Sequence, residues 1–252
     1  MVLTCLSGRA HVHALGVFDG HRGPEAARYA SRHLPALLER CLGSYPDISS
    51  ALTACFLLLD HGFRSEARPA DRYPGCTALV ALFAGPRLYL ANAGDCRAVL
   101  CRGGVAEALT RDHSAADDSE RTRVAAAGCQ VQWRQDGWRL GEAGLQVTRS
   151  LGDADLKPAV TAEPEITTTE LRSDAELLLV CSDGVWDAVR GNQAAVDLAQ
   201  ATVKDPTLIA KRIVFEAMAR GSRDNATCCA AVLGSATTAE CIFRDTSTGG
   251  SR

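Results

Sequence analysis

The sequence predicts an α+β protein in which antiparallel sheets are covered by helices. Short apolar runs of strand length follow one another in groups, and apolar-striped segments of helical length come in pairs. A strictly parallel fold would instead alternate single strands with single helices. The chain has 252 residues, 46% of them hydrophobic and 23% charged, which suits one large domain with a substantial core.

The N-terminal part predicts one strand followed by two helices. The apolar run His13–Phe18 predicts a buried strand that ends in the turn residues Asp19-Gly20. A helix is expected over Pro24–Arg40, because proline suits a first helical turn and leucines recur on one face. The very apolar middle of Ser49–Phe63 predicts a second helix.

Strands and helices are then expected to alternate in groups to the end of the domain. The turns Gly85-Pro86 and Gly94-Asp95 separate three short strands, and Gly128 ends a polar helix. In order, the expected elements are strands at Thr77–Phe83, Arg87–Ala93 and Cys96–Cys101, a helix at Ser114–Ala127, a strand at Glu176–Ser182, helices at Asn192–Val203 and Pro206–Arg220, and a strand at Ala226–Leu233. We expect residues 1–241 to form one domain and residues 242–252 a disordered tail.

Charge and cysteine usage exclude several classes of function. The net charge of −3 and the absence of a basic stripe argue against nucleic-acid binding. The apolar runs are too short for a membrane span, and the start shows no signal peptide, so a cytoplasmic or nuclear location is expected. The 11 cysteines include no CxxC pair, which favours reduced core residues over disulfides or a zinc site.

Three aspartates stand at the ends of predicted strands. Asp19 follows GVF, Asp183 follows LLLVCS, and Asp224 precedes the strand ATCCAAVL. Each taken alone is explained by capping of a turn. If the three aspartates converge, their carboxylates repel one another unless hard divalent cations such as Mg²⁺ or Mn²⁺ neutralise them. Two such ions roughly 3.5–4 Å apart can bind a phosphoryl group between them and activate a water molecule.

Two further residues near these aspartates have open interpretations. Asp187 lies four residues after Asp183, one helical turn away, which suits either another ion or a favourable helix N-terminus. His21 follows Asp19 by two residues and can protonate a leaving alkoxide, but it can equally be an exposed loop histidine.

The order of several short motifs resembles the type 2C metal-dependent protein phosphatases, the PPM family. The motifs are FDGH (Phe18–His21), GCTA (Gly75–Ala78), ANAGDCR (Ala91–Arg97), DH (Asp112-His113), VTRSLGD (Val147–Asp153), AEPEI (Ala162–Ile166), SDGVWD (Ser182–Asp187) and GSRDNAT (Gly221–Thr227). Together they cover about residues 12–234. The wording is most similar to the phosphatase half of plant kinase–phosphatase fusion proteins, which implies that a kinase domain can accompany this part in full-length relatives.

The resemblance implies a four-layer α-β-β-α sandwich and hydrolysis of phosphoserine and phosphothreonine on proteins by a metal-activated water. Two Mg²⁺ or Mn²⁺ ions, with a weak third, are implied as cofactors, a phosphoprotein as substrate, and a monomer as the working form. Carried over by motif, the metal ligands are Asp19, Gly20 through its carbonyl, Asp183 and Asp224, with Asp112 and Asp187 at the third position. His21 becomes the general acid.

The sequence departs from the family at its start. An R-x-x-M-E-D-like string, whose arginine holds the substrate phosphate, does not occur in it, so we expect a sandwich that lacks its first strand, with an unpaired sheet edge. Arg22 stands where many relatives have glycine, either as a substitute positive charge or as a solvated surface residue. A weakened phosphatase is therefore the first hypothesis. A non-enzymatic binding module on the same fold and another two-metal hydrolase remain as alternatives.

Overall fold

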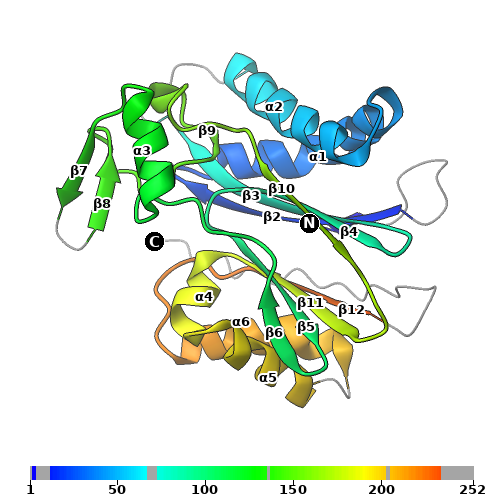
Figure 1. Ribbon diagram of the computed structural model, residues 1–252. Helices are drawn as coiled ribbons and strands as arrows, with labels where there is room; N and C mark the ends of the chain where they lie inside the picture. Colours follow the sequence, from blue (N-terminus) through cyan, green and yellow to red (C-terminus); the bar gives the residue numbers. More distant parts are fainter. Residues whose placement is uncertain (1, 4–11, 67–72, 135–136, 203–204, 234–252) are drawn as a thin grey trace.

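The computed structural model describes residues 2–3, 12–66, 73–134, 137–202 and 205–233, and arranges them in four layers (Figure 1). Two helices cover one sheet, a second sheet packs against the first, and three helices cover the second sheet. Every pairing between named strands is antiparallel. The predicted α-β-β-α sandwich is confirmed.

The first sheet is built around a strand that is apolar along its whole length. Its order is β1 (Val2–Leu3), β2 (Val12–His21), β3 (Gly75–Ala84), β4 (Arg87–Ala93) and β10 (Glu165–Glu170), with β9 (Leu151–Gly152) also pairing with β3. Nine of the ten residues of β3 are buried, because helices cover one face of the strand and the second sheet covers the other. A continuous apolar run is typical of such a doubly covered strand.

The second sheet has the order β12 (Cys228–Val232), β11 (Ala175–Cys181), β5 (Arg97–Arg102) and β6 (Val105–Ala108). Side chains of the two sheets interdigitate in a core that includes Leu15, Leu79, Leu100 and Val180. Each of these side chains is fully buried, and burying a side chain of this size stabilises a fold by about 1.5–3 kcal/mol.

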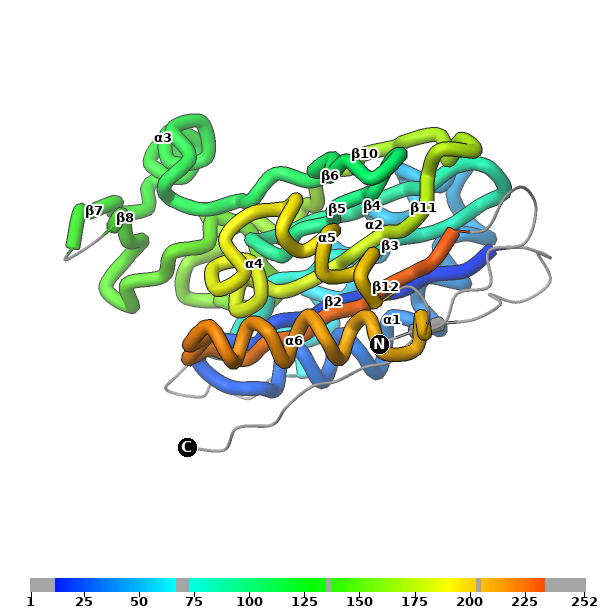
Figure 2. Tube along the Cα trace, turned by 90° about the horizontal axis from the view of Figure 1, so that it is seen from below, coloured from blue at the N-terminus to red at the C-terminus, as the bar shows by residue number. Residues whose placement is uncertain are grey.

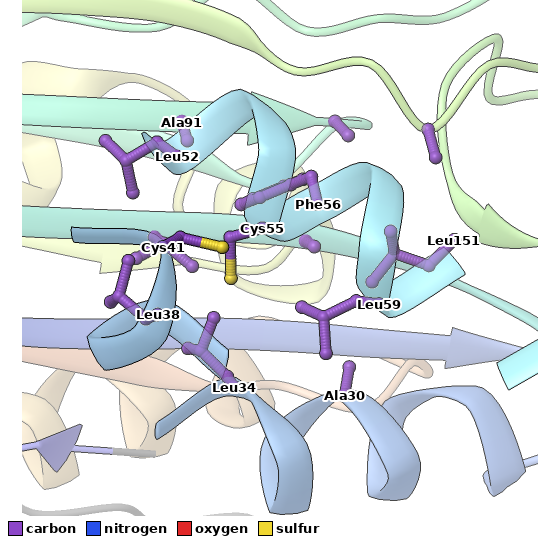
Figure 3. Packing of buried hydrophobic residues seen from close by; sticks show 14 of the residues in the cluster. Ala30, Leu34, Leu38, Cys41, Leu52, Cys55, Phe56, Leu59, Ala91 and Leu151 are labelled. Carbon is purple, nitrogen blue, oxygen red and sulfur yellow. The ribbon is translucent and has the colours of Figure 1, made fainter. Parts of the chain in front are cut away.

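Helices α1 (Glu25–Ser44) and α2 (Ile48–Glu66) cover the outer face of the first sheet. Figure 3 shows the core beneath them, where Leu34 and Cys41 of α1 face Cys55 and Phe56 of α2. The outer face of the second sheet is covered by α4 (Asp183–Val189), α5 (Asn192–Thr202) and α6 (Ile209–Ala219), the last entered through a 3-10 turn at Pro206–Leu208.

A small lobe projects from one end of the sandwich in both views (Figures 1 and 2). It consists of α3 (Asp118–Ala126), the hairpin of β7 (Val131–Arg134) and β8 (Gly137–Leu140), and a 3-10 turn at Ala154–Leu156, around its own core of Val124, Leu140 and Val160. The hairpin was not predicted. The helix expected at Ser114–Ala127 begins only at Asp118, because the Asp117 carboxylate caps it by accepting from the backbone N–H groups of Ser119 and Glu120.

One expectation about the sheet edge is wrong. The outer edge of β2 was expected to be unpaired, but β1 pairs with it, Val2 opposite Leu15 and Leu3 opposite Ala14. The expected tail at 242–252 lies outside the described residues. Within the described part of the chain, no helix is long and apolar enough to cross a membrane.

Candidate active site

The strand ends that carry the predicted aspartates meet at one end of the sandwich. In the first sheet, Asp19 near the end of β2 lies opposite Thr77 near the start of β3, and β4 ends close by, with Ala93 opposite Ala78. The short link from Gly94 to Cys96 leads directly from β4 into β5 of the second sheet. Since the end of β11 and the start of β12 pair at this same end of the second sheet, both sheets present their strand ends here.

Asp183 and Asp224 are brought together by the start of α4. Asp183 is the first residue of this helix, directly after β11 and Ser182, while Asp224 lies in the connection that leads into β12. Gly184 allows the close approach, because a Cβ atom at this position would lie 2.4 Å from the carbonyl oxygen of Asn225. Ser182 ties the same two segments together, accepting from the backbone N–H of Thr227 at 3.1 Å.

The electrostatics show that these carboxyl groups crowd one another. Burial raises the pKa of Asp19 to about 8, with further contributions from Asp183, Asp224 and Asp95. Burial and the charge of Asp224 raise the pKa of Asp183. Burial and the charge of Asp183 raise the pKa of Asp95 to about 7. We call Asp19, Asp95, Asp183 and Asp224 the carboxylate cluster.

The carboxylate cluster has the chemistry that a hard divalent cation requires. The Oδ1 atom of Asp183 is buried and has no hydrogen-bond partner among the described residues. A buried polar atom without a hydrogen-bond partner destabilises the fold unless a cation or a water molecule binds to it. Among the described residues, no three His, Cys, Asp or Glu side chains are already arranged to hold a metal ion together.

Asp112 and Asp187, expected at a third metal position, lie beside the cluster but differ from each other. Asp112 is engaged by Arg97, with its oxygens 3.1 Å from Nε and 2.5 Å from one terminal guanidinium nitrogen. Asp187 lies one helical turn after Asp183 and is exposed. Partial desolvation of its carboxyl group raises its pKa, while Arg97 acts in the opposite direction. Of the two, Asp187 is the freer ligand.

His21, the last residue of β2, is held by an aspartate that sequence reasoning did not single out. Its Nε2 atom lies 2.7 and 2.9 Å from the two carboxylate oxygens of Asp153, which is fully buried. Burial alone would raise the pKa of Asp153, but His21, Ser150 and Arg22 outweigh it and hold this pKa below its usual value. Since an ionised carboxylate only accepts, Nε2 of His21 carries the donated proton and Nδ1 is left for other chemistry.

Arg22 is neither a solvated surface residue nor a free cation beside the cluster. Its guanidinium group bonds to Asp153 and reaches both oxygens of Asp155, at 2.8 and 2.9 Å. Gly75, opposite His21 in the sheet, leaves room for this network, because a Cβ atom there would lie 2.2 Å from the Asp153 carboxylate. The structure therefore assigns Arg22 to the support of His21 and Asp153.

Gly20, expected to offer its carbonyl to a metal, lies between Asp19 and His21 and pairs with Cys76. Sequence reasoning missed Asp95 and Asp153 as parts of the site. Both stand in motifs that were recognised, ANAGDCR and VTRSLGD, and each directly follows a glycine, but only Asp95 lies at the end of a predicted strand.

Comparisons of sequence identify a family and relatives of this chain. A family model described as protein phosphatase 2C matches residues 2–226. The chain is 44% identical over 251 residues to a protein of Oryza sativa subsp. japonica named protein kinase and PP2C-like domain-containing protein, covering 96% of this chain and 38% of that relative. A probable protein phosphatase 2C 59 of Arabidopsis thaliana is 42% identical over 213 residues, covering 84% of this chain and 67% of the relative. The chain spans little more than a third of the kinase-containing relatives.

Solved structures agree on the fold. A structure described as a C. elegans sex determining protein has a TM-score of 0.81 at 28% identity, covering 87% of this chain and 56% of its own. A serine-threonine phosphatase 2C from Toxoplasma gondii has a TM-score of 0.75 at 20% identity, covering 89% of this chain and 85% of its own. With the family model matching most of its length, the chain belongs to the protein phosphatase 2C family.

Proposed function

We propose that this chain hydrolyses phosphoserine and phosphothreonine monoesters on proteins, with the aid of Mg²⁺ or Mn²⁺. The observation that carries the proposal is the carboxylate cluster. Burial and the neighbouring acids together raise the pKa of Asp19 to about 8, and one buried oxygen of Asp183 has no partner among the described residues. Such an arrangement is stable only with protons or with cations, and cations are what phosphoryl transfer uses.

Asp19, Asp183 and Asp224 would hold two ions, with the Gly20 carbonyl as a further ligand. Asp95 adds negative charge beside them. Asp187, with Asp112 once released from Arg97, would serve a weaker third ion. Bound ions would supply neutralisation of the phosphoryl oxygens and a lowered pKa for a coordinated water.

His21 would protonate the leaving serine or threonine oxygen. Because Nε2 donates to Asp153, the proton that reaches the substrate comes from Nδ1 of a doubly protonated ring. Asp153 is a positioning residue, because it holds the ring in one orientation. Arg22 and Ser150 in turn hold Asp153.

A second candidate function is a phosphopeptide-binding module without turnover. It is favoured by one observation, that no three His, Cys, Asp or Glu side chains of the described residues are already arranged to hold a metal ion. Arg22 is not free to hold a substrate phosphate, because its guanidinium group is engaged by Asp153 and Asp155. The relatives named for both a kinase and a PP2C-like domain support a kinase segment as a partner in the full-length protein.

The test is hydrolysis of p-nitrophenyl phosphate and of a phosphothreonine peptide by this chain with Mn²⁺, with EDTA, and as the Asp183→Asn variant. We expect metal-dependent turnover that falls by about 10³-fold or more in EDTA and in the variant, equal to several kcal/mol of transition-state stabilisation. Circular dichroism before each assay shows that the samples are folded. A folded wild-type chain that binds the peptide but never releases phosphate would favour the binding module.

A further inference from the structure

A pocket of about 590 Å³ opens directly beside the carboxylate cluster. Two acids of the candidate metal site, Asp187 and Asp224, form one side of it. Three arginines, Arg190, Arg220 and Arg223, line the rest, together with the small residues of α4 and of the segment after α6. The pocket therefore begins where the phosphoryl group would bind and continues over a basic surface.

Arg220 forms the fixed part of this surface. It caps the C-terminal end of α6 and reaches across to α4, where one terminal nitrogen donates to the Val189 carbonyl oxygen at 2.8 Å. Its Nε atom donates to Glu216 at 2.9 Å, so part of its charge is already matched. Arg220 thus holds the wall of the pocket in place.

Arg190 and Arg223 are the arginines that remain available. Both are exposed, and neither side chain makes a hydrogen bond or an ion pair with any described residue. Arg190 ends α4 in the left-handed region, with φ 57, and its N–H donates to the Trp186 carbonyl oxygen at 3.3 Å. The left-handed conformation is unfavourable for an arginine, so the surrounding structure must hold it, and it fixes the point from which the side chain leaves the helix.

The charges of the pocket favour an anion once the metal site is filled. Cations bound by the carboxylate cluster would neutralise Asp187 and Asp224, which leaves the guanidinium groups of Arg190 and Arg223 unmatched. Guanidinium groups bind carboxylates and phosphates through paired hydrogen bonds. A pocket of this volume is about 10 Å across, the length of about three residues of extended peptide.

We propose that this pocket binds an anionic side chain of the phosphoprotein substrate, within about three residues of the phosphoserine or phosphothreonine that is hydrolysed. The anion is either a carboxylate or a second phosphate, since both fit the same arginines. This inference rests on the proposed function, because it names the substrates that the carboxylate cluster would serve. Arg190 and Arg223 would then determine specificity without touching the reacting atoms.

The experiment measures kcat/KM for matched phosphothreonine peptides with Mn²⁺. One peptide has alanine on both sides of the phosphothreonine, others carry glutamate before or after it, and others carry a second phosphoserine there. We expect a preference for one anionic flank of about three- to tenfold per arginine, expressed mainly in KM and reduced by salt. Comparison of the glutamate and phosphoserine peptides identifies which anion is preferred.

The variants are Arg190→Asn, chosen because asparagine tolerates the left-handed backbone, and Arg223→Gln. The readout is the ratio of kcat/KM for anionic and alanine peptides, which cancels any general loss of activity. We expect this ratio to fall towards one in each variant and to reach it in the double variant. Arg212→Gln, an exposed arginine of α6 outside the pocket, is the matched control and should keep the wild-type ratio.

A ratio near one in the wild-type protein, or a ratio that survives in the double variant, would overturn the inference. If no peptide is hydrolysed at all, the proposed function fails, and fluorescence anisotropy of the labelled peptides decides the inference separately. Tighter binding of anionic peptides that the double variant loses would support the pocket. Equal binding of all peptides by wild type and double variant would refute it.

Discussion

Two kinds of acidic residue in this molecule have opposite environments. Glu120 of α3 is 3% exposed, and burial alone would raise its pKa, but bonds from Arg149, Arg123 and Thr148 outweigh burial and hold the pKa well below its usual value. Burial and the neighbouring acids Asp183, Asp224 and Asp95 raise the pKa of Asp19 in the carboxylate cluster to about 8. Glu120 therefore has cationic partners within the chain, while Asp19 has acids as neighbours, as the proposed cation site requires.

Asp153 resembles Glu120 in its environment, but it resembles the carboxylate cluster in its location. Arginine, serine and histidine surround it, and its pKa is lowered like that of Glu120. It lies at the active site, however, where it holds His21. The two environments therefore distinguish acids that position other side chains from acids that we propose to hold cations, and changing one acid of each kind tests this distinction.

The largest expected effect follows from Asp153→Asn. Loss of the carboxylate frees the His21 ring, so kcat for a phosphothreonine peptide should fall by about 10- to 100-fold with little change in KM. Hydrolysis of p-nitrophenyl phosphate, whose leaving group needs no proton, should fall much less. Asp155→Asn is the matched control, because Asp155 shares Arg22 but does not contact His21. Equal losses on both substrates would make Asp153 a structural residue only.

The next effect concerns stability. Glu120→Gln leaves Arg149 and Arg123 without their buried partner, so the free energy of unfolding should fall by about 2–4 kcal/mol in urea denaturation. Because the folded pKa of Glu120 lies below its unfolded value, the unfolded chain binds more protons in acid, and wild-type stability is lost as pH falls below about 4.5. In the variant, the free energy of unfolding should fall less steeply as the pH is lowered below about 4.5. The same pH dependence of the free energy of unfolding in wild type and variant would contradict the assigned environment of Glu120.

A smaller change in the free energy of unfolding, an increase instead of a decrease, is expected for a substitution in the carboxylate cluster. In EDTA, Asp183→Asn removes one crowded carboxylate and should stabilise the folded protein by about 1 kcal/mol, because repulsion with Asp19 and Asp224 is relieved. Thermal denaturation of wild type and variant at pH 7 measures this change. With Mn²⁺ present the order should reverse, since only the wild type keeps its full ligand set. A variant that is less stable in EDTA as well would show that Asp183 has a structural role.

The smallest effect is expected for Asp187→Asn. Asp187 is exposed and lies one helical turn beyond Asp183, so it is expected to bind only a weak further ion. The Mn²⁺ concentration for half-maximal activity should rise by about threefold, with little loss at saturating Mn²⁺. Loss of activity that saturating Mn²⁺ does not restore would show that Asp187 instead helps to hold the two main ions.

Apart from the polar helix α3, the elements that the sequence predicted are those with apolar patterns. Arg87–Ala93 has its predicted bounds, α2 and β3 extend beyond their predictions at both ends, and α1 begins at Glu25 and extends to Ser44. The missed strands lack such a pattern. The strand β10 is the mainly polar EITTTE, and only its pairing with β4 makes it a strand.

The site was predictable only in part, for a similar reason. Asp19, Asp183 and Asp224 each follow or precede an apolar strand, which is a local signal. The bond between His21 and Asp153 joins residues 132 positions apart, and Asp153 sits in a left-handed conformation in a connection without periodic pattern. Nothing near either residue in the sequence indicates the other. The engagement of Asp112 by Arg97 is likewise visible only in three dimensions.

The measurement that tests the central claim most directly is calorimetric titration of the metal-free chain with Mn²⁺, for the wild type and for Asp183→Asn. The account predicts saturable binding of two ions by the wild type and loss of at least one in the variant, with both proteins folded by circular dichroism. Absence of saturable binding by a folded wild type, or identical binding by the variant, would contradict the claim that the carboxylate cluster is a cation site.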